Sequence, residues 1–140
     1  MMDNSQLFKT IKLERTMCFG SCPVYKVSIH HSGRVTYTGE MFVEQEGRHV
    51  WYIDHAAITK LNKALEKSDY FNLEKENGIP WCTDLPFCNT MVEMQNGIKR
   101  KIEHYLNEPD EWPMTLMKFE EQVDKIIGVS KYVGRNGKIT

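Results

Sequence analysis

Apolar and polar residues alternate along the first third of the chain, which is the pattern of half-buried β-strands. The alternation predicts strands over residues 7–16, 24–31, 34–38 and 49–53. Ser32-Gly33 is typical of a tight turn between the second and third of these strands. Because the links between the strands are short, we predict an antiparallel meander.

A helical period replaces the alternation after residue 53. Asp54 is suited to the N-cap position, because its short carboxylate can accept a hydrogen bond from a free backbone amide of the first turn. Ile58, Leu61 and Leu65 follow at helical spacing and define one apolar face. We predict a helix that ends near Ser68, after which the apolar residues 70–73 fold back under it.

A second hairpin and a second helix follow. Asn96-Gly97 predicts a two-residue hairpin turn after a strand over residues 92–95, and the chain returns as a strand over residues 98–106. Gly128 is expected to end the second helix. The apolar stripe of that helix is Leu116, Phe119, Val123 and Ile126 or Ile127. The element order β-β-β-β-α-β-β-α predicts an α+β fold, a six-stranded mostly antiparallel sheet with two helices on one face.

Length and charge restrict the classes of protein to which the chain can belong. Its 140 residues suit one domain, for which we expect an ordered core over 7–133 and a flexible tail over 134–140. The 18 Lys and Arg against 19 Asp and Glu leave a net charge of -1, which argues against nucleic acid and anionic membranes as partners. Lys99 and Lys101 alternate along one strand, which is typical of a solvated face.

The start of the chain shows neither a basic segment nor an apolar run, and no stretch of the sequence is long enough to span a membrane. We therefore expect a cytoplasmic protein, or an exported one if a leader has been removed. In a reducing compartment, cysteines are more often free thiols or metal ligands than structural disulfides.

Strand direction predicts where the irregular segments meet. If the meander is continuous, the Cys18–Cys22 loop lies at the end of the first strand, and the chain leaves the fourth strand at the opposite end. A helix then returns the chain, so the aperiodic segment 74–89 lies beside the cysteine loop, as does the strand end at His104-Tyr105. We expect this shared end of the sheet to hold any functional site.

The cysteines are the first candidates for chemistry at that end. Cys18, Cys22, Cys82 and Cys88 are candidate zinc ligands, because thiolates bind zinc in sets of four. The three residues between the first pair fit a zinc knuckle, whereas the five between the second pair fit it poorly. The alternatives are a disulfide or packed thiols for the first pair and small apolar fillers for the second.

Further candidates are polar residues that are able to bind a ligand. Asp84 lies between cysteines in the long segment, where an aspartate either binds a ligand or caps its own turn. His104 and Tyr105 are the remaining candidates at the shared end. Glu120 and Glu121, by contrast, are interpreted as charges on the solvent face of the second helix.

These observations favour a non-enzymatic module that binds a ligand, a metal or a protein at the shared end. No cofactor other than zinc is indicated. The alternative is a cysteine-dependent enzyme or thiol redox protein that uses Cys18 or Cys22 with His104. The redox alternative lacks the usual two-residue spacing and the helix N-terminus that lower the pKa of such a thiol.

The motif Cys18-x-Gly20-x-Cys22-Pro23-x-Tyr25, preceded by Arg15-Thr16, resembles the opening of a bacterial domain family of unknown function. Thr83-Asp84-x-Pro86, Glu103-His104-Tyr105 and Tyr132-Val133-Gly134 resemble later parts of that family. The resemblance implies nothing about activity. Since members of the family are often exported or lipid-anchored, it does favour a disulfide between Cys18 and Cys22. The chain departs from the family pattern by carrying Cys82 and Cys88 and by showing no signal sequence.

Overall fold

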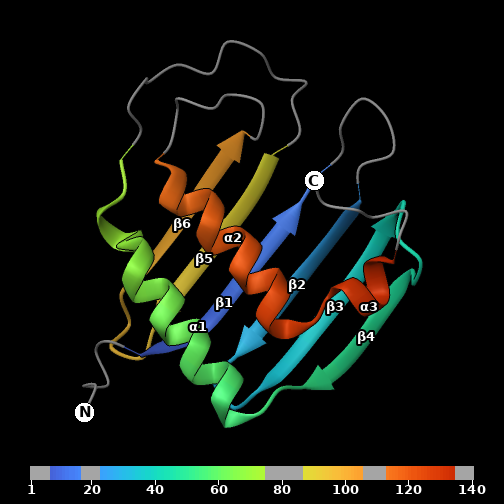
Figure 1. The fold of residues 1–140 in the computed structure, drawn as a ribbon, viewed down its shortest axis with the longest axis horizontal. Helices are drawn as coiled ribbons and strands as arrows, with labels where there is room; N and C mark the ends of the chain where they lie inside the picture. The colour runs from blue at the N-terminus through green and yellow to red at the C-terminus, as the bar shows by residue number, and fades with distance from the viewer. Residues whose placement is uncertain (1–6, 17–22, 75–86, 106–112, 135–140) are drawn as a thin grey trace.

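A computed structural model describes residues 7–16, 23–74, 87–105 and 113–134. Six antiparallel strands form one sheet in the order β4-β3-β2-β1-β5-β6. Helices cover one face of the sheet, and the other face is open (Figure 1). The elements are β1 (Phe8–Arg15), β2 (Val24–His30), β3 (Arg34–Met41), β4 (Gly47–Tyr52), α1 (His55–Ser68), the 3-10 turn η2 (Tyr70–Asn72), β5 (Phe87–Met94), β6 (Lys99–Tyr105), α2 (Met114–Ile127) and α3 (Ser130–Val133). The predicted α+β class and antiparallel sheet are confirmed.

The two long helices begin and end largely where the sequence predicts. The Asp54 carboxylate accepts a hydrogen bond from the amide of Ala57 at 2.9 Å, which confirms it as the N-cap of α1. Gly128 takes the left-handed conformation, with φ 73°, that ends α2. At the other end of α1, Asp69 takes this conformation although it carries a side chain, with φ 54°.

Two details of the second hairpin differ from the prediction. β5 begins at Phe87, so the last residues assigned to the irregular segment 74–89 belong to a strand that pairs with β1. Pairing with the central strand therefore overrides the weak local signal there. The turn at Asn96-Gly97 has three residues, because the amide of Gly97 bonds to the carbonyl of Met94, and that of Met94 to the carbonyl of Ile98. Only Gly97 has a positive φ, whereas a two-residue type I′ turn needs one at both positions.

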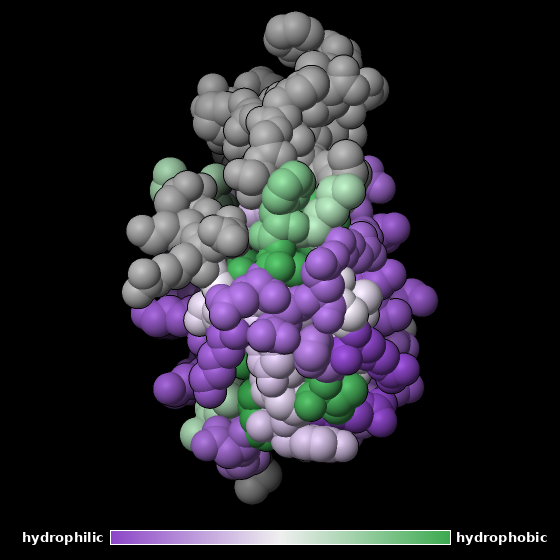
Figure 2. Space-filling view, turned by 90° about the vertical axis from the view of Figure 1, so that its right-hand side faces the viewer, coloured by the Kyte–Doolittle hydropathy of each residue, from purple (hydrophilic) through white to green (hydrophobic). Residues whose placement is uncertain are grey.

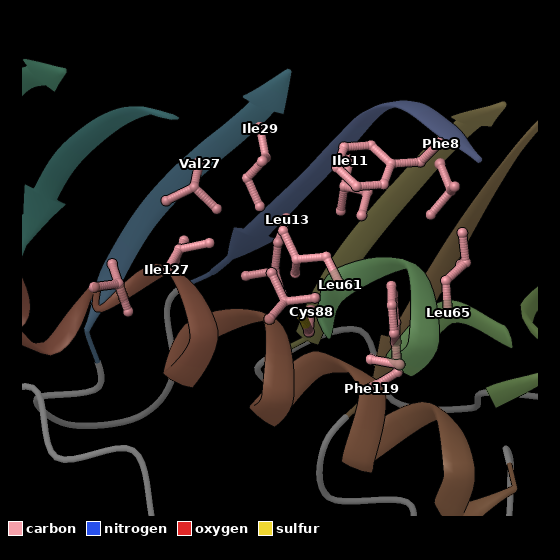
Figure 3. Packing of buried hydrophobic residues seen from close by; sticks show 14 of the residues in the cluster. Phe8, Ile11, Leu13, Val27, Ile29, Leu61, Leu65, Cys88, Phe119 and Ile127 are labelled. Atoms are coloured by element: carbon pink, nitrogen blue, oxygen red, sulfur yellow. The ribbon is translucent and has the colours of Figure 1, made fainter. Parts of the chain in front are cut away.

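The core lies between the sheet and the helix pair, and α1 packs beside α2 across it (Figure 1). Alternate residues of each central strand point into this layer and meet the apolar stripes of the helices. The open face is polar, and the side of the molecule beside β4 is covered largely by hydrophilic residues (Figure 2). The labelled core residues in Figure 3 are Phe8, Ile11, Leu13, Val27, Ile29, Leu61, Leu65, Cys88, Phe119 and Ile127.

The C-terminal part of the described chain closes the core over β3 and β4. The indole of Trp51 stacks on the ring of Tyr132 at 4.4 Å between centroids and 8° between planes. Its Nε1 donates to the carbonyl of Ile127 at 2.9 Å. Tyr132 lies in α3 together with Val133, which is buried. Trp51 is therefore an internal packing residue, not a stacking platform for a ligand.

Within the described residues, no helix combines the length and the apolar character that a membrane crossing requires.

Candidate functional site

Four strands carry one row of residues at the same end of the sheet. Arg15 lies opposite Tyr25 on β2 and opposite Cys88 on β5, and Cys88 lies opposite His104 on β6. On the outer side, Val24 lies opposite Met41 at the end of β3. The connections 17–22, 75–86 and 106–112 begin or end beside this row, as the strand directions predict. We call this part of the molecule the loop end of the sheet.

A buried ion pair lies directly beneath the loop end. Nη2 of Arg15 donates to Oδ2 of Asp124 on α2 at 2.7 Å, and Nε donates to the same oxygen at 3.0 Å. Nε also reaches the Tyr25 hydroxyl at 3.1 Å, and that hydroxyl in turn hydrogen-bonds to Asp124. Arg15 thereby ties β1, β2 and α2 together at one point.

Burial sets the protonation of this group. It raises the pKa of the Tyr25 hydroxyl, and it raises the pKa of the Asp124 carboxyl although Arg15 opposes that rise. For Arg15, burial lowers the pKa, but the neighbouring Cys88, Asp124 and Tyr25 raise it more, so the guanidinium keeps its proton. Oδ1 of Asp124 is buried, and no described residue donates to it. The buried guanidinium of Arg15 and the Asp124 carboxyl therefore lie beneath the loop end, and Oδ1 of that carboxyl accepts no hydrogen bond from the described residues.

A second buried acid corrects the sequence interpretation. The helical pattern assigns Glu120 to the solvent face of α2, yet it is 0% exposed and hydrogen-bonds to the thiol of Cys88. It lies one helical turn before Asp124, so the two carboxylates share the face that packs on the sheet. Arg15 is a sequence signal that some acid is buried, because it follows Ile11 and Leu13 at an inward position and so requires a buried partner.

Cys88 lies among the apolar side chains between the sheet and the helices (Figure 3). It is a free thiol whose pKa is raised well above the ordinary value, first by burial and then by the charge of Glu120. A buried thiol with a raised pKa is a poor nucleophile at neutral pH. Among the described residues, no three His, Cys, Asp or Glu side chains are grouped so as to hold a metal ion.

The other predicted site residues lie outside the described side chains. Cys18, Cys22, Cys82 and Asp84 fall in segments whose structure is not described. The backbone of His104 and Tyr105 is described, and it forms the last two residues of β6, at the loop end.

An exposed apolar corner that the sequence did not suggest completes the loop end. Met41 and Phe42 are 43% and 47% exposed, and Phe42 adopts φ 55°, a left-handed conformation that is strained for an aromatic residue. The turn is held by buried Val43 and by hydrogen bonds from the amides of Glu44 and Gln45 to the carbonyls of Val133 and Tyr132. Figure 2 shows a group of apolar side chains just below the grey atoms at the top of the view.

The pH dependence of an Arg15→Met variant tests the charge state beneath the loop end. A carboxyl whose pKa is higher in the folded chain than in the unfolded one contributes stability at low pH that is lost as the pH rises through the folded pKa. In the Arg15→Met variant, Arg15 no longer lowers the pKa of the Asp124 carboxyl, whereas burial still raises it. We expect chemical denaturation to show a smaller cost of Arg15→Met at pH 4.5 than at pH 7.5. Lys26→Met, at an exposed position, should show no such change. An Arg15→Met cost that is the same at both pH values would contradict the assignment.

Fold and geometry together define a small α+β domain with one helix-covered face and one open face, in which the strand ends that flank three connections share one end of the sheet. The chain belongs to the family described as Domain of unknown function (DUF6438), whose model matches residues 9–127. No curated protein matches the chain.

Proposed function

We propose that the domain is a non-enzymatic binding module that holds a protein partner at the loop end. The partner surface would comprise the Cys18–Cys22 segment, the 74–89 segment, His104-Tyr105 and the Met41–Phe42 corner. Binding residues on connections that a rigid scaffold positions are a common solution in proteins. Here the scaffold is the strand row fastened to α2 through Arg15.

The observation that carries the proposal is Phe42. An aromatic side chain in a left-handed conformation costs about 1–2 kcal/mol, and packing within the molecule offsets that cost only in part, because Phe42 remains 47% exposed. Exposed aromatic residues on a rigid backbone are the usual anchors of protein interfaces. From β3 to β6, the loop end spans four strand spacings, or about 19 Å.

A Phe42→Gly variant separates binding from stability. Glycine adopts φ 55° without strain, and this relief offsets the loss of the packing that the half-exposed ring provides. We therefore expect the free energy of unfolding to change by less than about 1 kcal/mol. Affinity for the partner should fall by about 2 kcal/mol, or roughly thirtyfold. The matched control is Tyr52→Ser, which removes an aromatic residue that is 73% exposed at the opposite end of β4.

The partner is sought as a protein that wild type and Tyr52→Ser both retain from an extract, without reference to Phe42→Gly. The purified partner is then titrated against all three proteins, and amide exchange is compared with and without it. The proposal expects slower exchange at residues 41–45. Equal affinity of Phe42→Gly and wild type, or protection confined to α1 and the lower strand ends, would overturn it.

Two measurements test the competing functions. A rapid, stoichiometric alkylation of Cys18 or Cys22 at neutral pH that disappears in His104→Ala would favour the cysteine-dependent enzyme instead. Native mass spectrometry tests the zinc site of Cys18, Cys22, Cys82 and Cys88. A mass excess of one zinc that a chelator removes would make the loop end a metal site, whereas a loss of two hydrogens per bridge on oxidation would indicate disulfides.

A further inference from the structure

The open face of the sheet, opposite the helices, contains a hollow of about 560 Å³. Its lining reaches Glu14, Lys26 and Asn89, which are next in sequence to the loop-end row. Four of the residues that line it are lysines, Lys12, Lys26, Lys99 and Lys101, and one is a glutamate, Glu14. These five residues give the hollow a formal charge of +3, four minus one, in a chain whose net charge is -1. We call this region the lysine hollow.

Most of this positive charge is not held in ion pairs with the described residues, although Glu93 on β5 lies opposite Lys99 on β6. Lys12, Lys99 and Lys101 form no ion pair with any residue that the structure describes. Lys26 approaches Glu40 only to 3.7 Å, with both side chains about half exposed, and such pairs contribute little. Glu14 accepts a hydrogen bond from the Asn89 amide, which draws the one carboxylate toward a neutral partner.

Neutral donors lie between the lysines. Ser28, Thr36 and Thr38 line the hollow, and their hydroxyl groups make no hydrogen bond to any described residue. Because Lys12, Ser28 and Thr36 lie opposite one another on β1, β2 and β3, they form a single row. Lys101 continues the row on β6 beyond Met91, so its Cα lies about 10 Å from that of Lys12.

This combination of groups selects one ligand chemistry. Ammonium groups on flexible stems together with hydroxyl donors suit the oxygens of phosphate groups, and several converging charges suit a ligand with more than one phosphate. The lining contains no aromatic side chain on which a nucleobase would stack. The groove between α1 and α2 also carries four lysines, but its neutral lining is mostly aliphatic and offers few hydroxyl donors.

We propose that the lysine hollow binds the phosphate groups of a soluble, multiply phosphorylated small molecule. This site is independent of the loop end, so either proposal can fail without the other. Binding there would leave the Met41–Phe42 corner free, which allows a small molecule and a protein partner to be held at once.

Isothermal titration with inorganic tripolyphosphate and inorganic phosphate tests the proposal. At low salt, tripolyphosphate should bind at least about tenfold more tightly than phosphate, and 0.5 M salt should weaken the binding strongly. The double variant Lys12→Gln/Lys101→Gln should lose about tenfold or more in tripolyphosphate affinity. The matched control is Lys63→Gln/Lys67→Gln, which removes the same charge from the groove between α1 and α2.

Each result decides the question once circular dichroism has shown that both variants are folded. Selective loss in Lys12→Gln/Lys101→Gln supports the lysine hollow, and shifts of the amide signals of residues 12, 28 and 36 in NMR spectra would place the ligand there. Equal losses in both double variants would show attraction to net charge alone. That result, or the absence of tripolyphosphate binding to wild type, would overturn the proposal.

Discussion

Asp124→Ala is expected to lower the free energy of unfolding by about 3–5 kcal/mol, because it leaves the buried guanidinium of Arg15 without its only ion-pair partner among the described residues. Arg15 cannot escape this cost by losing its proton, because an arginine guanidinium stays protonated in proteins. Urea denaturation at pH 7 followed by circular dichroism measures the change. Glu40→Ala, which breaks the exposed pair with Lys26, should cost less than about 1 kcal/mol.

A double variant separates the loss of the pair from the loss of packing. Arg15→Met/Asp124→Leu replaces both charges by apolar groups, and it should recover most of the stability that Asp124→Ala loses. If Asp124→Ala cost no more than Glu40→Ala, the ion pair would not fasten α2 to the sheet. The scaffold for the loop end would then have to be sought elsewhere.

Gly39→Ala is the second substitution with a large expected effect. A Cβ at Gly39 would clash with the carbonyl oxygen of Gln45 and lie 2.6 Å from the Tyr37 hydroxyl and 2.8 Å from Cγ2 of Val43. Since a backbone atom cannot turn aside as a side chain can, the whole turn must move away from the sheet. Overpacking of this kind costs up to about 3 kcal/mol, and it should also break the hydrogen bond from Tyr37 to Gln45.

Gly47 supplies the control, because it lies opposite Gly39 on β4 and has open space around its Cα. Gly47→Ala should lower the free energy of unfolding by only about 1–2 kcal/mol, which is the cost of placing an alanine at a positive φ of 85°. Amide exchange should rise at Glu44 and Gln45 in Gly39→Ala and stay unchanged in Gly47→Ala. Equal stability losses without a change in exchange would show that the turn is not pinned to α3.

The fold was predictable because most of its elements have a strong local signal. The alternation of Ile11 and Leu13 with polar neighbours, the Asp54 cap and the Gly128 stop all report backbone choices that packing then reinforces. The start of β5 was missed because its strand character depends on partners that are remote in sequence. Phe87 pairs with a residue of β6, and the rest of β5 pairs with β1. Strand direction was enough to bring the connections to one end.

The chemistry of the loop end was much less predictable. A cysteine motif draws attention to thiols, whereas the described residues at this end are organised by Arg15, Asp124 and Glu120. Charged residues on a helix are normally solvated, so Glu120 and Asp124 carry no local sign of burial. Only the inward position of Arg15 required a partner, and nothing in the sequence indicates which acid supplies it. The strain at Phe42 likewise depends on a turn held by distant residues.

The position of β1 has a consequence for the nascent chain. β1 is an inner strand, yet its two neighbours are made at different times: β2 follows at once, but β5 begins only at residue 87. Until the ribosome has released that strand, one edge of β1 offers unpaired amides and carbonyls to other chains. The Arg15–Asp124 bond, which spans 109 positions, forms later still. A fragment that ends before β5 therefore keeps an unpaired strand edge that can pair with other chains. The domain completes its folding only when nearly all of it has been synthesised.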